Sequence, residues 1–202
     1  MTNKHYFKRG LIVVIGSFIM GIGIYLTMLS QLGNDPLTMF WIGVSKQLSL
    51  TVGQANLLVS GIMLFIVFFF QRKELSVGSL LNPVVIALTT DLLVKLPIEA
   101  SNWPLRLAFF LVGIVLLSFG VAFYALADFG RGAYEAVTFT LIHQLKLSVR
   151  TVRIGCDLTF AIAGILLGAQ LSIGPVLAIL LMGTLIQFFI QRLVQPIQRY
   201  LT

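Results

Sequence analysis

Two short polar interruptions of an otherwise apolar chain contain the side chains best suited to bind a solute. The first reads Leu32-Gly33-Asn34-Asp35-Pro36 and is followed by Thr38, and the second reads Phe129-Gly130-Arg131-Gly132 and is followed by Glu135. A helix that is broken inside a protein leaves N–H and C=O groups unpaired, and these groups carry partial charge. Asp35 before Pro36 is typical of a helix start, because proline suits the first helical position.

These interruptions supply most of the predicted site. Glu135 follows Arg131 by one helical turn, so the sequence predicts a local ion pair between them. Asp91 is a further candidate, because ionisable groups within membrane spans are functional by default; the alternative is a structural pair with Lys95 near the outer membrane surface. The breaks themselves could instead be ordinary capped turns at headgroup level. The predicted solute-binding residues are Asn34, Asp35, Thr38, Asp91, Asp128, Arg131 and Glu135, and the predicted break glycines are Gly33, Gly130 and Gly132.

The composition predicts that these breaks lie within a lipid bilayer. Of the 202 residues, 58% are hydrophobic and 10% are charged, and the mean hydropathy is +0.99. Soluble domains usually carry about 25% charged residues. Most of the apolar runs approach the length of about 20 residues that crosses a hydrocarbon core. The runs are 10–29, 54–70, 77–94, 105–127, 154–168 and 173–190. We therefore expect an all-α integral membrane protein.

Other classes of function fit the sequence poorly. The net charge of +7 comes from basic residues in short loops beside the spans, which is the positive-inside pattern and not a nucleic-acid footprint. His5 and His143 are isolated and no phosphate-binding loop is visible, so we expect no enzyme activity, metal or cofactor. Cys156 is the only cysteine and has no partner within the chain. The first apolar run is too long for a cleaved signal peptide, which predicts a retained helix.

The two halves of the chain follow one plan. A shift of 97 residues brings Gly23 onto Gly120 and Gly33 onto Gly130, and a shift of 96 brings Gly78 onto Gly174. Polar and glycine landmarks in the same order predict an internal duplication. The expected domains are a cytoplasmic tail (1–9), a first membrane repeat (10–98), a linker (99–104), a second membrane repeat (105–193) and a cytoplasmic tail (194–202).

Each half contains a segment that is too short to be an ordinary span. Leu37–Leu48 has about 12 residues, or about 18 Å as a helix, and Thr51 is the predicted N-cap of the next helix. If the short segments do not cross, the chain has six spans and inverted halves; if they cross, it has eight spans and parallel halves. Both versions place eleven of the 14 basic residues and both termini on the cytoplasmic side. Length favours six spans plus two broken or re-entrant helices.

These landmarks resemble the YitT/YczE family of bacterial membrane proteins. The resemblance rests on Gly21–Leu37, Leu48–Ala55 and Val77–Asn82, and on their echoes Phe129–Gly132 and Leu147–Arg153. It implies a bacterial inner-membrane protein with a poorly defined role, in a family often assumed to contain transporters. In that family an acidic residue commonly follows the break proline; here Asp35 precedes Pro36, and Thr38 occupies the later position. Glu135 retains an acid at the equivalent place in the second break.

Two functions of different classes remain as hypotheses. In repeat-built transporters, short interrupted helices in matching positions mark the binding site, which predicts a small-solute permease with alternating access between the halves. The rival is a non-transporting scaffold or accessory subunit, in which Gly164 and Gly168 at GxxxG spacing would pack against another membrane protein. The expected partners are the lipid bilayer and an unknown small solute, or alternatively a membrane-protein partner or a second copy of the chain.

Overall fold

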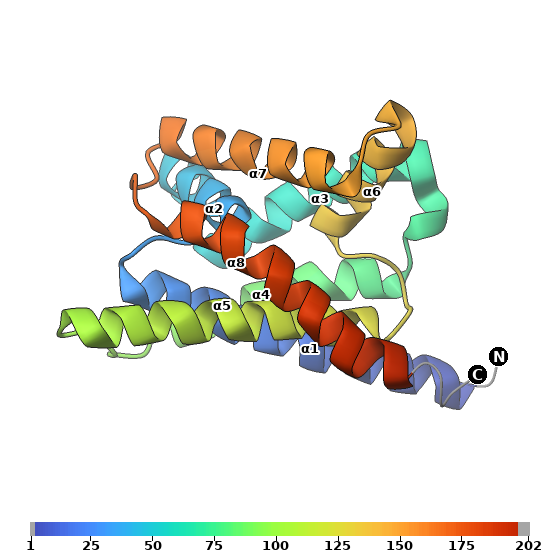
Figure 1. Ribbon diagram of the computed structural model, residues 1–202, viewed down its shortest axis with the longest axis horizontal. Helices are drawn as coiled ribbons and strands as arrows, with labels where there is room; N and C mark the ends of the chain where they lie inside the picture. The colour runs from blue at the N-terminus through green and yellow to red at the C-terminus, as the bar shows by residue number, and fades with distance from the viewer. Residues whose placement is uncertain (1–2, 198–202) are drawn as a thin grey trace.

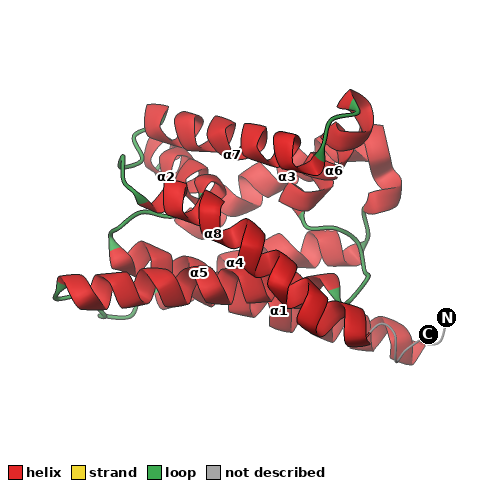
Figure 2. Ribbon diagram, in the orientation of Figure 1, coloured by secondary structure: helices red, strands yellow, loops and turns green. Residues whose placement is uncertain are grey.

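The computed structural model describes residues 3–197, with side chains from residue 6 onward. Its regular structure is entirely helical in that range, and Figure 2 shows no strand there. The α-helices are α1 (Asn3–Ser30), α2 (Pro36–Leu48), α3 (Val52–Gln71), α4 (Val77–Leu93), α5 (Trp103–Ala125), α6 (Ala133–Leu145), α7 (Val149–Leu166) and α8 (Gly174–Phe189). The short helices η1 (Arg72–Glu74) and η2 (Ile190–Val194) follow α3 and α8. Arg199 and most of the expected 194–202 tail lie outside the described residues.

Four helical segments of the described chain are long and apolar enough to cross a membrane: Tyr6–Ser30, Val52–Glu74, Trp103–Ala125 and Gly174–Ile197. α4 is apolar but shorter, with 17 residues. The apolar sequence of α7 is interrupted by the charged residues Arg150, Arg153 and Asp157. The all-helical fold expected from composition is therefore confirmed for the described residues, and four of its segments are long and apolar enough to cross a membrane.

The helix boundaries follow from local capping. The Asp35 side chain accepts a hydrogen bond from the Thr38 amide and Pro36 takes the first position of α2, as predicted. Thr51 caps α3 through a capping box with Gln54, which confirms its predicted role. α7 begins at Val149, five residues before the predicted apolar run, because Ser148 caps it and its two arginines are good helix formers.

α1 and α5 pack closely against each other through glycines (Figure 1). A Cβ atom on Gly16 would lie 3.1 Å from the carbonyl oxygen of Gly120, and a Cβ atom on Gly23 would lie 2.7 Å from that of Gly113. The residue numbers rise along α1 as they fall along α5, so the two helices are antiparallel. Small residues at such positions allow the close backbone approach that is common between helices in lipid.

The short helices α2 and α6 each pack on a helix of the other half. α2 lies against α7, where a Cβ atom on Gly164 would meet the backbone of Met39 at 2.8 Å, and α6 lies against α3. Gly164 is therefore occupied by a contact within the chain, which leaves the predicted GxxxG pair with Gly168 unavailable as a docking surface. The two halves interlock through these exchanged helices.

The chain at both ends of α2 contacts the connection between α7 and α8. Before α2, the carbonyl oxygen of Leu32 accepts a hydrogen bond from the Gly174 amide at 2.9 Å. At the end of α2, Lys46 and Gln47 donate hydrogen bonds to the carbonyl oxygens of Gly168 and Leu167 at 2.9 and 3.0 Å. The chain therefore enters and leaves the α2 region at the same end of the molecule.

Candidate functional site

The first break is shaped by a glycine and by buried polar contacts. Gly33 has a φ of +108°, which L-residues rarely adopt, so the chain can reverse direction after α1. Asn34 is buried and donates a hydrogen bond to the Thr27 hydroxyl at 2.8 Å, so its side chain holds the break in place. Asp35 is only 7% exposed and uses Oδ2 to accept the Thr38 amide at 3.1 Å. This geometry brings the start of α2 into the interior of the bundle.

The second break is held differently. Gly130 has a φ of +87°, and its carbonyl oxygen accepts a hydrogen bond from the Tyr124 hydroxyl at 2.9 Å. Arg131 turns toward η1, where its amide donates to the Glu74 carbonyl at 3.0 Å and its guanidinium pairs with the Glu74 carboxylate. The Arg131 guanidinium also lies 3.7 Å from the ring centre of Phe139.

The predicted Arg131–Glu135 pair is wrong. α6 starts at Ala133 after Gly132 in an extended conformation, so Arg131 lies outside the helix and the one-turn spacing does not apply to it. Glu74, which is 57 residues away in the sequence, takes its place. The side chain of Asp128 is 82% exposed and lies 3.8 Å from Arg9.

Asp91 takes part in a helix cap. Its Oδ1 accepts the Gly53 amide at 2.9 Å, and its other oxygen accepts the Thr51 hydroxyl. The carboxylate thus stabilises the start of α3, where negative charge is favoured by the helix dipole. Asp91 is part of neither a Lys95 pair nor the cavity described next.

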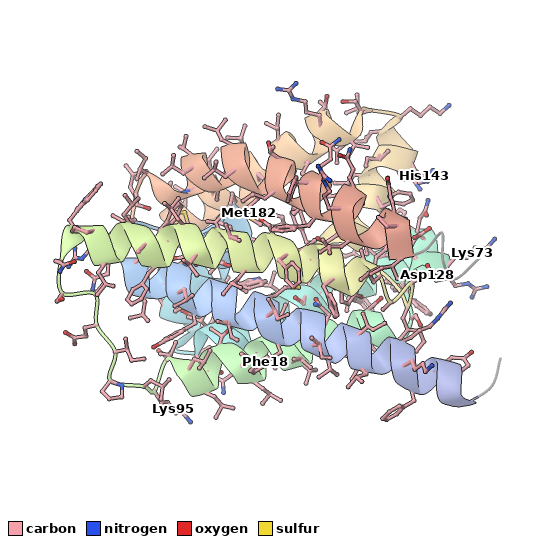
Figure 3. The ribbon with its side chains drawn as sticks, turned by 60° about the horizontal axis from the view of Figure 1, so that its bottom comes forward. Phe18, Lys73, Lys95, Asp128, His143 and Met182 are labelled. Carbon is pink, nitrogen blue, oxygen red and sulfur yellow. The ribbon has the colours of Figure 1, made fainter. Side chains whose placement is uncertain are left out.

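A cavity of about 670 Å³ lies at the centre of the bundle, and all eight α-helices of the described chain contribute residues to its lining. Both break helices start at this cavity: Asp35 and Thr38 line it from the first break and Glu135 lines it from the second. Met182 is another lining residue, and Figure 3 labels it between the ends marked by Lys95 and by Lys73. The structure thus brings together three of the predicted site residues and leaves Asn34, Asp91, Asp128 and Arg131 outside.

Four charged or ionisable lining residues were not in the predicted site. These are Tyr134 on α6 and Arg150, Arg153 and Asp157 on α7. The Tyr134 hydroxyl donates a hydrogen bond to Asp157, and the Arg153 guanidinium lies 5.4 Å from the centre of the Tyr134 ring. A sequence signal existed, since the 97-residue shift brings Asn56 onto Arg153 and Ser60 onto Asp157, which are polar pairs one turn apart in two apolar runs.

Three buried polar atoms in the cavity wall have no hydrogen-bond partner among the described residues. They are Oδ1 of Asp35, Oγ1 of Thr38 and Nε1 of Trp41. The lining amides of the first half are satisfied: Asn56 donates to the Pro83 carbonyl at 3.0 Å, and Asn82 donates to the Ser17 hydroxyl at 2.9 Å. The unpartnered groups are therefore concentrated on α2, and buried groups of this kind usually have a partner.

The cavity is closed on one side and open on the other. α3 and α4 pack against each other, and the Asn56–Pro83 hydrogen bond joins them. α7 and α8 make little contact, and the lining residues Arg150, Ile154, Thr184 and Gln187 are exposed. In Figure 1, α7 and α8 diverge from the end where the chain joins them. The cavity is thus accessible between α7 and α8.

A resident metal ion has no obvious ligand set here. The described residues contain no group of three or more His, Cys, Asp or Glu side chains arranged to hold a metal ion. What the cavity offers instead is a mixture of carboxylates, arginines, an indole and hydroxyls, which can bind a small organic molecule by hydrogen bonds and charge.

The fold is that of a helical membrane protein with a central cavity whose wall contains several polar and charged groups. The chain belongs to a family of unknown function, DUF6198, which matches residues 7–191. It is similar to an uncharacterized protein of Haemophilus influenzae, with 30% identity over 184 residues that cover 91% of this chain and 84% of the relative. It is also similar to the uncharacterized membrane protein YczE of Bacillus subtilis, with 26% identity over 181 residues that cover 89% of this chain and 84% of the relative.

A third relative is the uncharacterized protein YyaS of Bacillus subtilis. It is 30% identical over 181 residues, which cover 87% of this chain and 89% of the relative. No solved structure matches the chain. The similarity to YczE confirms the family resemblance that the sequence landmarks suggested.

Proposed function

We propose that the protein is a small-solute permease of the bacterial cytoplasmic membrane, a secondary transporter that works by alternating access. The observation that carries the proposal is the central cavity, because both break helices begin at it and three of its buried polar atoms lack partners. Interrupted helices whose ends meet near the bilayer centre form the substrate sites of repeat-built transporters. The sequence has no nucleotide-binding motif, so an ion gradient or a partner subunit would supply the energy.

Reciprocal contacts support an internal duplication with inverted halves. The 97-residue shift converts Gly16 into Gly113 and Gly23 into Gly120, so the Gly16–Gly120 and Gly23–Gly113 approaches are counterparts of each other. Likewise, Gly174 lies against Leu32 as Gly78 lies against Phe129. In each case a contact between one residue of the first half and one of the second is repeated between their counterparts in the opposite halves. A twofold axis between the halves produces such reciprocal contacts.

Two observations favour six spans over eight. The segments on either side of α2 bond to the same 167–174 connection, as expected of a re-entrant helix. α1 and α5 are antiparallel, which requires an odd number of crossings in the first half.

The two ends of the molecule carry different charged residues, because Lys73 and Asp128 lie at the end opposite Lys95 (Figure 3). Since basic residues gather beside the start of α1, we infer that both termini are cytoplasmic.

The test is uptake into proteoliposomes that contain the purified protein. A panel of labelled amines, amino acids, sugars, vitamins and carboxylates is offered with and without an imposed proton gradient. We expect uptake of at least one class, and its loss in Thr38→Val and Glu135→Gln, whereas Asp128→Asn outside the cavity retains it. No uptake from the whole panel, or normal uptake by both cavity variants, would count against a permease.

The scaffold alternative is supported by glycines on the outer surface. Gly61 on α3 and Gly155 on α7 have open space where a side chain would be, so they leave room for another helix to approach. Purification in native lipid would decide, because a scaffold is expected to retain a stoichiometric membrane-protein partner and to show no solute-dependent change in melting temperature.

A further inference from the structure

The unpartnered groups of the cavity lie along one face of α2. Asp35, Thr38 and Trp41 are spaced by three residues, so their side chains project from neighbouring turns on one side of the helix. Each is nine-tenths or more buried: Asp35 is 7%, Thr38 1% and Trp41 5% exposed. All three residues line the cavity. A ligand in this cavity can therefore approach these three groups from the same side.

The chemistry of the three atoms is complementary to a molecule with two polar functions. Oδ1 of Asp35 can accept a hydrogen bond, or donate one only if the acid is protonated, whereas Nε1 of Trp41 can only donate. The Thr38 hydroxyl can do either. The ligand must thus offer a donor to Asp35 and an acceptor to Trp41.

The donor that fits Asp35 best is a cation. The ion pairs found between described side chains are Arg9–Asp128 and Arg131–Glu74, and neither involves Asp35. A carboxylate taken out of water needs a paired charge and hydrogen bonds to offset its desolvation. The nearby indole and the ring of Tyr134 add aromatic surfaces, which attract ammonium groups.

From this geometry we propose that the cavity binds a small organic molecule that carries an ammonium group. The ammonium donates to Oδ1 of Asp35, and a hydroxyl, ether or carbonyl oxygen of the same molecule accepts from Nε1 of Trp41. A volume of about 670 Å³ lies within the range of small-molecule sites. The proposal rests on the permease function and specifies its substrate class. Arg150 and Arg153 at the α7–α8 opening can also face the carboxylate of a zwitterion.

The test compares molecules with one skeleton and different charge. Purified protein is melted with millimolar tyramine, with its alcohol tyrosol, with the anion 4-hydroxyphenylacetate and with zwitterionic tyrosine. We expect tyramine, or tyramine and tyrosine, to raise the melting temperature, and tyrosol and the anion to leave it unchanged. Equal stabilisation by tyrosol, preference for the anion, or no shift with either amine would overturn the assignment.

The Asp35→Asn variant tests the contribution of the negative charge of Asp35 alone. Asparagine is as good an N-cap as aspartate, so the hydrogen bond to the Thr38 amide can persist while the negative charge is lost. We expect amine affinity to fall by at least about tenfold in Asp35→Asn and more modestly in Trp41→Phe, since bonds to charged groups are the stronger ones. Asp128→Asn is the matched control and should bind as the native chain does. Unchanged amine affinity in a folded Asp35→Asn protein would overturn the proposal.

The substrate class and the transport function can fail separately. If the anion or the alcohol binds and is taken up by proteoliposomes, the permease remains and the ammonium assignment is wrong. If tyramine binds through Asp35 but no amine enters proteoliposomes, the ammonium site remains and transport is wrong.

Discussion

The contact between the Tyr134 hydroxyl and Asp157 joins the second break to α7 inside the cavity wall. The two residues belong to consecutive helices joined by the short connection 146–148, and the hydrogen bond helps to fix how α6 packs against α7. The side-chain donor to Asp157 is thus an uncharged hydroxyl, although Arg153 lies one turn before Asp157 on the same helix. The hydrogen-bond partner of Asp157 is therefore a tyrosine on another helix.

Tyr134→Phe removes that donor and keeps the ring. We expect a loss of about 1–2 kcal/mol of stability, because a partly buried carboxylate loses a hydrogen bond. The measurement is the melting temperature in detergent, with Tyr6→Phe, at an exposed site, as control. The double variant Tyr134→Phe/Asp157→Asn should lose far less stability than the sum of the losses in the two single variants, because both changes remove the same hydrogen bond. Strict additivity would show that the bond contributes nothing.

Gly33 and Gly130 allow a second test at the scale of single residues. Their φ angles of +108° and +87° strain any L-side chain, and a Cβ atom at Gly130 would also lie 2.8 Å from the Ser76 amide. Gly33→Ala and Gly130→Ala should each cost about 1–3 kcal/mol. Gly61→Ala, on an open helical surface, should be neutral or slightly stabilising. Similar melting temperatures for all three would contradict the strained breaks.

Among the helices, local signals were predictable and distant partners were not. Asp35, Pro36 and Thr51 mark the starts of α2 and α3 because caps involve residues only three apart. The role of Asp91 depends on Thr51 and Gly53, which come about 40 residues earlier, and no pattern in its own run indicates them. The same limit hid the Glu74 partner of Arg131. Of the predicted site, Asp35, Thr38 and Glu135 reach the cavity because the breaks position them.

The α1–α5 packing can be tested at the scale of these two helices. A Cβ atom on Gly23 would lie 2.6 Å from the Leu117 backbone nitrogen, so Gly23→Ala must push the helices apart. We expect lower expression and a melting temperature several degrees below that of Gly155→Ala, whose position is open. The cost should be of the order of 1–3 kcal/mol, as for overpacking in a close-packed interior. A Gly23→Ala protein as stable as Gly155→Ala would show that the helices are not held this closely.

For the molecule as a whole, the proposed inverted arrangement of six spans predicts which loops share a side of the membrane. Single cysteines at positions 46 and 72, in a Cys156→Ala background, report this with an impermeant maleimide on intact cells. Six spans predict labelling at Lys46→Cys and protection at Arg72→Cys. Labelling at 72 without labelling at 46 would instead support eight spans.

The interlocking of the halves predicts that the covalent link between them is dispensable. Residues 94–99 between α4 and α5 are exposed, whereas α1–α5, α2–α7 and α3–α6 all join one half to the other. A gene cut between Pro97 and Ile98 should therefore yield two polypeptides that assemble when they are produced together. Co-purification of 1–97 through a tag on 98–202, with the melting behaviour of the intact chain, is the expected result. The chain can then be regarded as a heterodimer whose subunits happen to be fused.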